Sequence, residues 1–267
     1  MCPPEHFRVA YTINPWMDPR VPVDSELAGK QWQRLRETLC DLGHTVHLLD
    51  PEPGLPDMVY TANGAFVLDG VAYGARFRHP QRAPEADAHR RWYERHGWRY
   101  VAPTAVNEGE GDLAYVAGVI LAGYGWRTDP AAHRELRELF GREVIPLRLV
   151  DPRFYHLDTA LAVLDAERIA YYPGAFSEES QAVLRRRFPD AVIASAADAA
   201  TFGLNLVSDG GHVVLNAEAT GMAATLARAG YTPVPVELSE LRKGGGSVKC
   251  CVAELRGAPA GGDAPGA

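Results

Sequence analysis

Apolar and polar residues follow one another along this chain in a pattern that recurs five times. Short apolar runs that begin at glycine or proline predict strands at residues 43–49, 97–103, 141–147, 189–195 and 230–236. These runs start 41 to 54 residues apart. A near-constant period of this size is typical of repeat architectures.

A stretch with helical periodicity precedes each of these strands. The predicted helices cover residues 30–42, 84–96, 130–140, 178–188 and 220–229. Each ends close to glycine or proline, the residues that most often stop a helix. Helix and strand therefore belong to the same repeating unit.

Pairs of short apolar runs between these units predict hairpins. Residues 64–68 and 71–75 flank Asp69-Gly70, and residues 206–208 and 212–215 flank a similar turn. Each unit then reads strand, strand, helix, strand. Hairpins argue against the alternative, a twisted barrel with a parallel sheet.

Five such units around one axis would form an α/β fold, a five-bladed propeller of pseudo-five-fold ββαβ repeats with the loops converging on one cleft. We expect one catalytic domain over residues 1–256. Residues 257–267 consist mostly of glycine, alanine and proline and predict a disordered tail.

Charge and composition exclude several function classes. The formal charge is −7 with a pI near 5.7, which argues against nucleic acid or an anionic membrane as partner. No secretory signal and no apolar run of membrane-spanning length is visible. We expect a cytoplasmic protein that acts on a small molecule, and the sequence leaves a homo-oligomer open.

Four cysteines stand at positions 2, 40, 250 and 251, without a disulfide framework or the spacing of a metal site. Cys250 differs from the others because it follows Gly244–Gly246, a segment that can turn tightly and leave a thiol in a cleft. Cys251 would point to the other side of the same segment and into the core.

His156 is the partner that would make Cys250 a nucleophilic site. It lies two residues before Asp158, at the entrance of the apolar run 160–164. On an extended entrance these two side chains face the same way, so an imidazole and a carboxylate would enter one cleft together. A histidine at the surface is the alternative interpretation.

Acidic and amide side chains in turns complete the set of candidate residues. Glu108 and Asp112 flank glycines before a predicted strand at residues 113–121. Without clustered histidine or cysteine ligands, such a pair favours an organic cation over a metal. Asn14 and Asn63 each follow a short apolar run, where asparagine commonly makes local turn bonds.

Taken together, five segments resemble the guanidino-modifying (pentein) superfamily, over essentially the whole chain and in the right order. The superfamily includes arginine deiminases, dimethylarginine dimethylaminohydrolases and amidinotransferases. The segments are residues 14–17, 60–63, 108–112, 156–159 and 244–250. The resemblance also implies a five-bladed α/β propeller and a reaction that uses no metal and no other cofactor.

By this resemblance Cys250 would attack the guanidinium carbon and His156 would be the acid and base. Glu108 would hold the guanidinium and orient His156, and Asp158 would be a second guanidinium ligand. Arg82 and Arg127 would clamp the carboxylate of the amino acid, a task that suits a planar guanidinium. Other arginines in the same loop as Arg82, at positions 76 and 78, leave that choice open.

One departure sets the expected product. Deiminases and dimethylargininases generally carry an acid where this chain has Asn63, and Asn63 together with Asn14 resembles the bacterial arginine dihydrolases. The resemblance therefore implies conversion of L-arginine to ornithine, carbon dioxide and two ammonia. The alternatives are a deiminase or dimethylargininase that yields citrulline, an amidinotransferase, and a non-catalytic protein that binds arginine.

Overall fold

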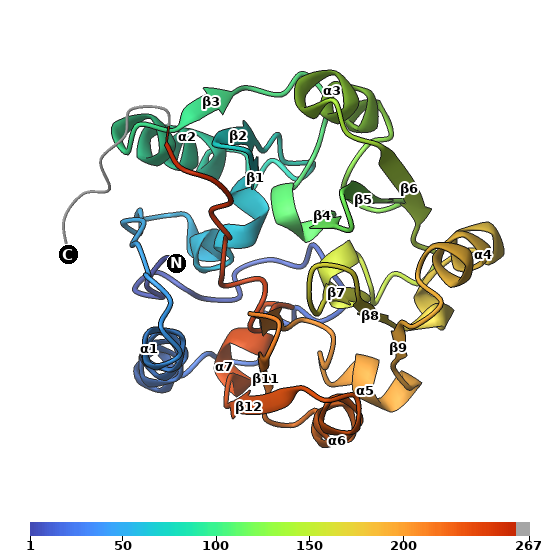
Figure 1. The fold of residues 1–267 in the computed structure, drawn as a ribbon. Helices are drawn as coiled ribbons and strands as arrows, with labels where there is room; N and C mark the ends of the chain where they lie inside the picture. Colours follow the sequence, from blue (N-terminus) through green and yellow to red (C-terminus); the bar gives the residue numbers. More distant parts are fainter. Residues whose placement is uncertain (260–267) are drawn as a thin grey trace.

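Four three-stranded sheets and the helices around them make up the part of the chain that the computed structural model describes, residues 1–259 (Figure 1). In each sheet two consecutive strands form an antiparallel hairpin, and the third strand pairs parallel with the second. A helix connects the second strand to the third, as a parallel crossover requires. The predicted ββαβ unit is thus present four times.

The elements follow one another along the chain in the same order in every unit. The first two units are β1 (Ala65–Leu68), β2 (Val71–Gly74), α2 (Glu85–Arg95) and β3 (Arg99–Val101), then β4 (Leu113–Val116), β5 (Val119–Tyr124), α3 (Ala131–Phe140) and β6 (Val144–Arg148). The other two are β7 (Leu161–Val163), β8 (Ile169–Tyr171), α4 (Glu178–Arg187) and β9 (Val192–Ile193), then β10 (Val207–Ser208), β11 (His212–Asn216), α6 (Thr220–Arg228) and β12 (Thr232–Val236).

All five predicted helices are present. Helices α2, α3, α4 and α6 lie around the outside of the molecule, and α1 (Ser25–Asp41) lies on the same periphery (Figure 1). Helix α1 begins at Ser25 rather than at residue 30, because the Asp24 side chain accepts a hydrogen bond from the Leu27 amide and caps the first turn. Short elements α5 (Ala196–Ala200) and α7 (Ser239–Arg242) were not predicted.

Two predicted strands are wrong. Residues 43–49 form no strand. They make two backbone hydrogen bonds with the N-terminus, in which the Leu49 amide donates to the Met1 carbonyl and the Met1 amino group donates to the His47 carbonyl, both at 2.9 Å. Residues 113–121 are not one strand but span β4 and part of β5. A tight turn separates them, with Ala117 at φ +51° and Gly118 at φ +77°. Alanine rarely adopts this conformation, so the turn gave no sequence signal.

The beginning and the end of the described chain share one hydrophobic core. Trp32 and Leu35 of α1 pack in the same buried cluster as Leu238 and Leu241 around α7. Cys250 and Cys251 belong to this cluster too. The segment that carries the predicted nucleophile is therefore packed into the same apolar core as the N-terminal helix.

After Cys251 the chain runs across the molecule to the β1–β2 hairpin. The Gly70 amide donates to the Arg256 carbonyl at 3.2 Å, and the Ala258 carbonyl lies above the same turn. Residues 257–259 of the predicted tail thus lie beside this hairpin. Residues 260–267 are outside the described part, and their disorder stays a prediction.

Within residues 1–259, no helix is both long and apolar enough to cross a bilayer. The cytoplasmic location stays a prediction.

The contribution of the tail contact at Gly70 to stability can be measured by comparison with a similar turn that has no such contact. Gly70 and Gly118 occupy the same position of two similar turns, at φ +78° and +77°. A Cβ on Gly70 would lie 2.6 Å from the Ala258 carbonyl oxygen, whereas a Cβ on Gly118 would meet nothing within 4 Å. We expect both substitutions to alanine to lower the free energy of unfolding by about 1 kcal/mol through backbone strain. Gly70→Ala should cost about 1 kcal/mol more, because it also displaces the hydrogen-bonded tail.

Urea denaturation followed by circular dichroism gives both values. Equal losses in the two variants would mean that residues 256–258 contribute nothing to stability at this hairpin.

Candidate functional site

A fully buried carboxylate, Glu108, is the centre of the candidate site. One oxygen, Oε2, accepts from His156 Nε2 and from Arg127 Nη1, both at 2.8 Å, and Oε1 accepts from the Arg78 amide at 3.1 Å. Burial opposes ionisation, but the charge of Arg127 and the hydrogen bond from His156 outweigh it and hold the pKa of Glu108 below its usual value. Because an ionised carboxylate can only accept, His156 must carry its proton on Nε2.

The loops that carry these three side chains are tied together by Asp112. Its Oδ1 accepts from the Leu157 amide at 3.0 Å, next to His156, and its Oδ2 accepts from the Thr128 amide at 3.1 Å, next to Arg127. Burial raises the pKa of Asp112 to about 6. Asp112 therefore positions the loops, and its oxygens are engaged by backbone rather than aimed at a cation.

Cys250 lies beside Asp158, as predicted for two members of one site. The thiol is 2% exposed, and Sγ lies 3.2 Å from Asp158 Oδ2. Burial, reinforced by the Asp158 charge, raises the pKa of Cys250 well above its usual value, and burial raises that of Asp158 to about 7. An organic cation placed here would favour the ionised forms of both groups.

Asn205 holds these two residues in place, and sequence reasoning missed it. Its Oδ1 accepts from the amides of Ser247 (3.0 Å) and Cys250 (3.2 Å), and its Nδ2 reaches the Asp158 carbonyl at 3.1 Å and Cys250 Sγ at 3.2 Å. Asn205 is 0% exposed. No spacing in the sequence links it to residues more than forty positions away.

The glycines before Cys250 are required by close neighbours. A Cβ on Gly244 would lie 2.2 Å from the Tyr60 hydroxyl, and one on Gly246 would lie 2.9 Å from Cys250 Cβ. Gly245, at φ +89°, packs on Asn14, whose Nδ2 donates to the Gly244 carbonyl at 3.1 Å. Asn14 also accepts from the Trp16 amide at 2.9 Å. Asn14 thus holds the glycine loop, and its role as a substrate ligand stays a prediction.

A second buried group surrounds Arg82. Its guanidinium binds Glu85 through two hydrogen bonds of 3.0 and 2.8 Å and donates through Nη1 to Asn63 Oδ1 at 2.6 Å. Asp57, which sequence reasoning also missed, is 2% exposed and accepts from the Tyr11 hydroxyl at 2.8 Å. Its only signal was a carboxylate inside the apolar run 55–60.

Backbone contacts bring the two groups together. The Ala62 amide, next to Asn63, donates to the Cys250 carbonyl at 3.1 Å. The Tyr155 hydroxyl, next to His156, donates to the Gly245 carbonyl at 2.7 Å. Cys250 and His156 make no direct hydrogen bond in the described part of the chain.

Several buried polar atoms of this site have no hydrogen-bond partner within residues 1–259. They are Asp57 Oδ1, Asn63 Nδ2, His156 Nδ1, Asp158 Oδ1 and Ser247 Oγ. Buried polar groups are normally satisfied, so unpaired polar atoms that gather at one place indicate a binding site. Among the described residues, the buried acids Asp57 and Glu85 pair with Arg82 and Glu108 pairs with Arg127, whereas Asp158 forms no ion pair with an arginine. The arrangement fits a cationic ligand with several N–H donors.

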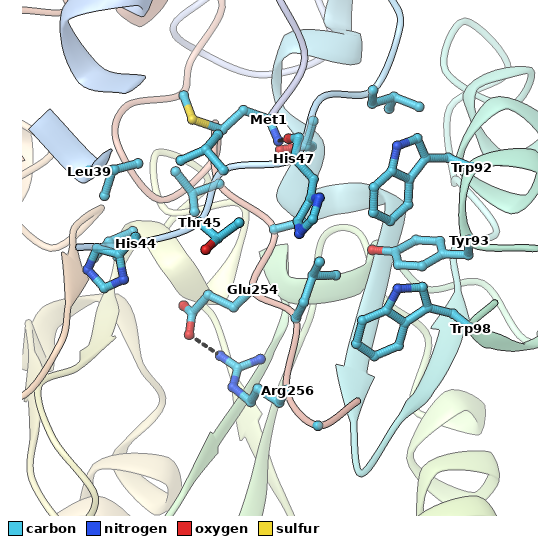
Figure 2. A pocket seen from close by; sticks show the side chains of 18 of the residues that line it. Met1, Leu39, His44, Thr45, His47, Trp92, Tyr93, Trp98, Glu254 and Arg256 are labelled. Carbon is cyan, nitrogen blue, oxygen red and sulfur yellow. Dashed lines mark hydrogen bonds and ion pairs between the residues drawn. The ribbon is translucent and has the colours of Figure 1, made fainter. Parts of the chain in front are cut away.

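A cavity of about 560 Å³ lies outside the candidate site (Figure 2). Trp92, Tyr93 and Trp98 form one wall, and Met1 and the segment 252–259 border it. None of the eight residues predicted for the site lines this cavity. Over residues 1–259, no cluster of three or more His, Cys, Asp or Glu side chains is arranged to hold a metal ion.

The raised pKa of Asp158 predicts a pH dependence of stability. Between its ordinary pKa of 3.8 and the raised value of about 7, the folded protein holds a proton that the unfolded chain releases. Asp158 therefore makes folding less favourable as pH rises through this window, by at most about 1.4 kcal/mol per pH unit. Asp158→Asn should remove this slope, in urea denaturation between pH 4 and pH 7.

Asp190→Asn, at an exposed position, is the matched control and should leave the slope unchanged. If Asp158→Asn shows the slope of the parent protein, Asp158 is ionised throughout the window in the unliganded site.

Comparison with known proteins places the chain in a family. The family model described as "N,N dimethylarginine dimethylhydrolase, eukaryotic" matches residues 13–257. A dimethylarginine dimethylaminohydrolase of Mycobacterium tuberculosis is 56% identical over 255 residues, which are 96% of this chain and 84% of the relative. The bifunctional arginine dihydrolase/ornithine cyclodeaminase ArgZ of Synechocystis is 36% identical over 94% of this chain but only 36% of its own length.

Solved structures agree with this result. The substrate-bound N-terminal domain of ArgZ, an arginine dihydrolase, matches with a TM-score of 0.92 at 33% identity, over 97% of both chains. A dimethylarginine dimethylaminohydrolase adduct matches with a TM-score of 0.75 at 21% identity, which shows the same fold. The chain therefore belongs to the dimethylarginine dimethylaminohydrolase family of the guanidino-modifying (pentein) superfamily and is a hydrolase of carbon–nitrogen bonds in linear amidines.

Proposed function

We propose that the protein hydrolyses the guanidino group of an L-arginine-type amino acid, with Cys250 as nucleophile. The observation that carries this proposal is the set of unpartnered buried atoms around Cys250, His156 and Asn63. Carboxylate oxygens of Asp57 and Asp158 would accept from the N–H groups of a guanidinium. Such charge-assisted hydrogen bonds are the strong ones in a buried site.

In the first half of the reaction the Cys250 thiolate forms a bond to the guanidinium carbon. The tetrahedral intermediate then breaks a carbon–nitrogen bond, and the departing amine takes a proton from His156. The thiol of the unliganded site is protonated, so the bound cation would lower its pKa and assist its ionisation. Asp158, 3.2 Å from Sγ, is the nearest acceptor for that proton. Passed on to His156 Nδ1, this proton would be the one that the departing amine takes.

In the second half, His156 takes a proton from water, and the hydroxide attacks the same carbon. The carbon–sulfur bond breaks, the hydroxyl proton passes to solvent water, the thiolate is restored, and a ureido group is left. Glu108 would keep the imidazole in the tautomer that leaves Nδ1 free for these transfers. Arg127, whose guanidinium lies 4.7 Å from the centre of the Tyr155 ring, remains our proposal for binding the substrate carboxylate.

Two substrates compete for this chemistry, and the comparisons support a methylated one better. Both the matching family model and the relative at 56% identity carry the name of dimethylarginine hydrolysis. This was the alternative interpretation of the sequence. Its product would be citrulline with dimethylamine.

The geometry of the site supports unmethylated L-arginine. Within residues 1–259, neither Asp57 Oδ1 nor Asp158 Oδ1 accepts a hydrogen bond. A guanidinium without methyl groups has N–H donors on both terminal nitrogens, whereas asymmetric dimethylarginine has none on one of them. Burying an unpaired carboxylate oxygen against methyl groups is costly.

Asn63 supports continuation to ornithine. An amide N–H can donate to the neutral ureido oxygen of the first product, so that product would stay for a second attack. This second round would release another ammonia and leave a carbamate, which loses carbon dioxide to give ornithine. In the related ArgZ domain, a variant with asparagine replaced by serine is covalently bound to a reaction intermediate.

We also propose that the molecule is a five-bladed propeller in one domain over residues 1–256. Helix α1 on the periphery, and the core that it shares with the segment 236–252, support a fifth unit built from both parts of the chain.

A product assay tests the proposed function. Purified protein is given L-arginine or asymmetric dimethylarginine, and ornithine, citrulline, ammonia and dimethylamine are quantified. We expect turnover of at least one substrate, and Cys250→Ser should abolish it because no thiolate remains. Cys251→Ala, a change at the buried neighbour, is the matched control and should keep activity. No turnover of either compound, or activity in Cys250→Ser, would contradict the proposal.

Asn63→Asp tests the basis of the second round. A carboxylate favours the cationic guanidinium over the neutral ureido group, by roughly 1 kcal/mol or more from the difference between charge-assisted and neutral hydrogen bonds. If L-arginine is the substrate, the variant should release mainly citrulline. An unchanged yield of ornithine would show that Asn63 does not retain the intermediate.

A further inference from the structure

We propose that Arg82 and Glu85 are positioning residues that fix the side-chain amide of Asn63 with its NH₂ group toward the substrate. This inference rests on the proposed function, since it concerns what that site recognises. It differs from the role that the family resemblance gave Arg82, which was to clamp the substrate carboxylate.

The orientation of Asn63 follows from the chemistry of its neighbour. Arg82 Nη1 lies 2.6 Å from Asn63 Oδ1, and a guanidinium has only donors. Rotating the amide by half a turn would set two donors against each other at this distance. The oxygen must therefore face Arg82, and Nδ2, which has no partner within residues 1–259, faces the other way.

Glu85 fixes the plane of Arg82. Its carboxylate is 0% exposed and binds Arg82 Nε and Nη2 side by side, which turns Nη1 toward Asn63. Arg82 Nη2 also donates to the Asp57 carbonyl at 3.2 Å, and the guanidinium lies 4.8 Å from the centre of the Phe77 ring. Every nitrogen of Arg82 is thus engaged by the protein, which suits a positioning role.

The free end of Asn63 lies beside the proposed acid and base. The point where a Cβ of Gly111 would lie is 2.5 Å from Asn63 Nδ2 and 3.0 Å from His156 Nδ1. Both nitrogens are buried, and neither has a hydrogen-bond partner in the described part of the chain. A donor held at this place disfavours the N–H groups of a cation and favours an oxygen, such as that of a ureido group.

The two roles of Arg82 predict different binding results. Arginine and citrulline carry the same carboxylate, so loss of a carboxylate clamp would weaken both equally. Loss of the orientation would instead free Asn63 to turn its oxygen toward the cation, and only the preference between the two ligands would change.

The experiment measures the dissociation constants of L-arginine and L-citrulline by calorimetry in the Cys250→Ser background, where no turnover occurs. Arg82 and Glu85 are both replaced by methionine, which removes both charges of this ion pair. Asp57, whose Oδ2 lies 3.9 Å from Arg82 Nε, keeps its hydrogen bond from Tyr11. We expect the ratio of the citrulline constant to the arginine constant to rise about five- to tenfold. An unchanged ratio, with both ligands weakened alike, would overturn the inference and favour the clamp.

The control repeats the exchange in an Asn63→Asp background. A carboxylate presents the same oxygens after half a turn, so the ratio should not respond to Arg82 and Glu85 there. A response of the same size in both backgrounds would show that the effect does not pass through Asn63 and would overturn the inference.

Glu85→Gln is the second variant, for the case that the double replacement does not fold. It keeps Arg82 but weakens the bonds that fix its plane, and the ratio should rise about two- to threefold. No change in this folded variant would count against the inference. If the Cys250→Ser protein binds neither arginine, dimethylarginine nor citrulline, the proposed function itself fails, which is distinct from binding with an unchanged ratio.

Discussion

The buried carboxylate of Glu108 is the constraint around which the site is organised. A negative charge without solvent contact is tolerated only where cations and hydrogen bonds compensate it. Arg127, His156 and the Arg78 amide provide that compensation, and they come from three different loops. One ion thereby fixes the tautomer of His156, the position of Arg127 and the distance between their loops. Asp112, on the same turn as Glu108, binds the loops of His156 and Arg127 as well, because it accepts from the Leu157 and Thr128 amides.

Charge also explains why the unliganded site resists the reactive state of Cys250. Burial raises the pKa of the thiol and of Asp158 beside it, so neither group readily becomes an anion when the site is empty. The raised pKa of Asp158 favours its neutral form in the empty site, and a bound cation would favour its ionised form. Recognition and activation would then be the same event, because the ligand supplies the charge that the nucleophile lacks. A thiol guarded in this way is also protected from unspecific oxidation.

Local signals allowed much of the fold to be predicted from the sequence. Periodicity and glycine or proline stops identified the helices, and Asp69-Gly70 identified the first hairpin. The strand predicted at residues 43–49 was wrong because an apolar run forms a strand only where a partner strand is present. The turn at Ala117 was not predicted because alanine rarely adopts the left-handed backbone conformation found there.

Some residues of the site could likewise be predicted from local sequence patterns, and others could not. Cys250, His156 and Glu108 stand in segments with a recognisable local pattern, and the structure buries all three. Asn205 and Glu85 act through the residues that they hold in place, and Asp57 contacts Tyr11, which is distant in the sequence. Neither their residue type nor their local sequence indicates those contacts. The structure alone could reveal that Asn205 binds the backbone of the nucleophile loop.

The core that α1 shares with the far end of the chain has a consequence for biosynthesis. Trp32 and Leu35 leave the ribosome some two hundred residues before Leu238 and Leu241, which cover them in the finished protein. At about 5–20 residues per second, this apolar face stays uncovered for roughly ten seconds or longer. An apolar face that stays uncovered for this time is the kind of surface that chaperones bind. The four later units can fold one after another, while the first helix waits for its partner.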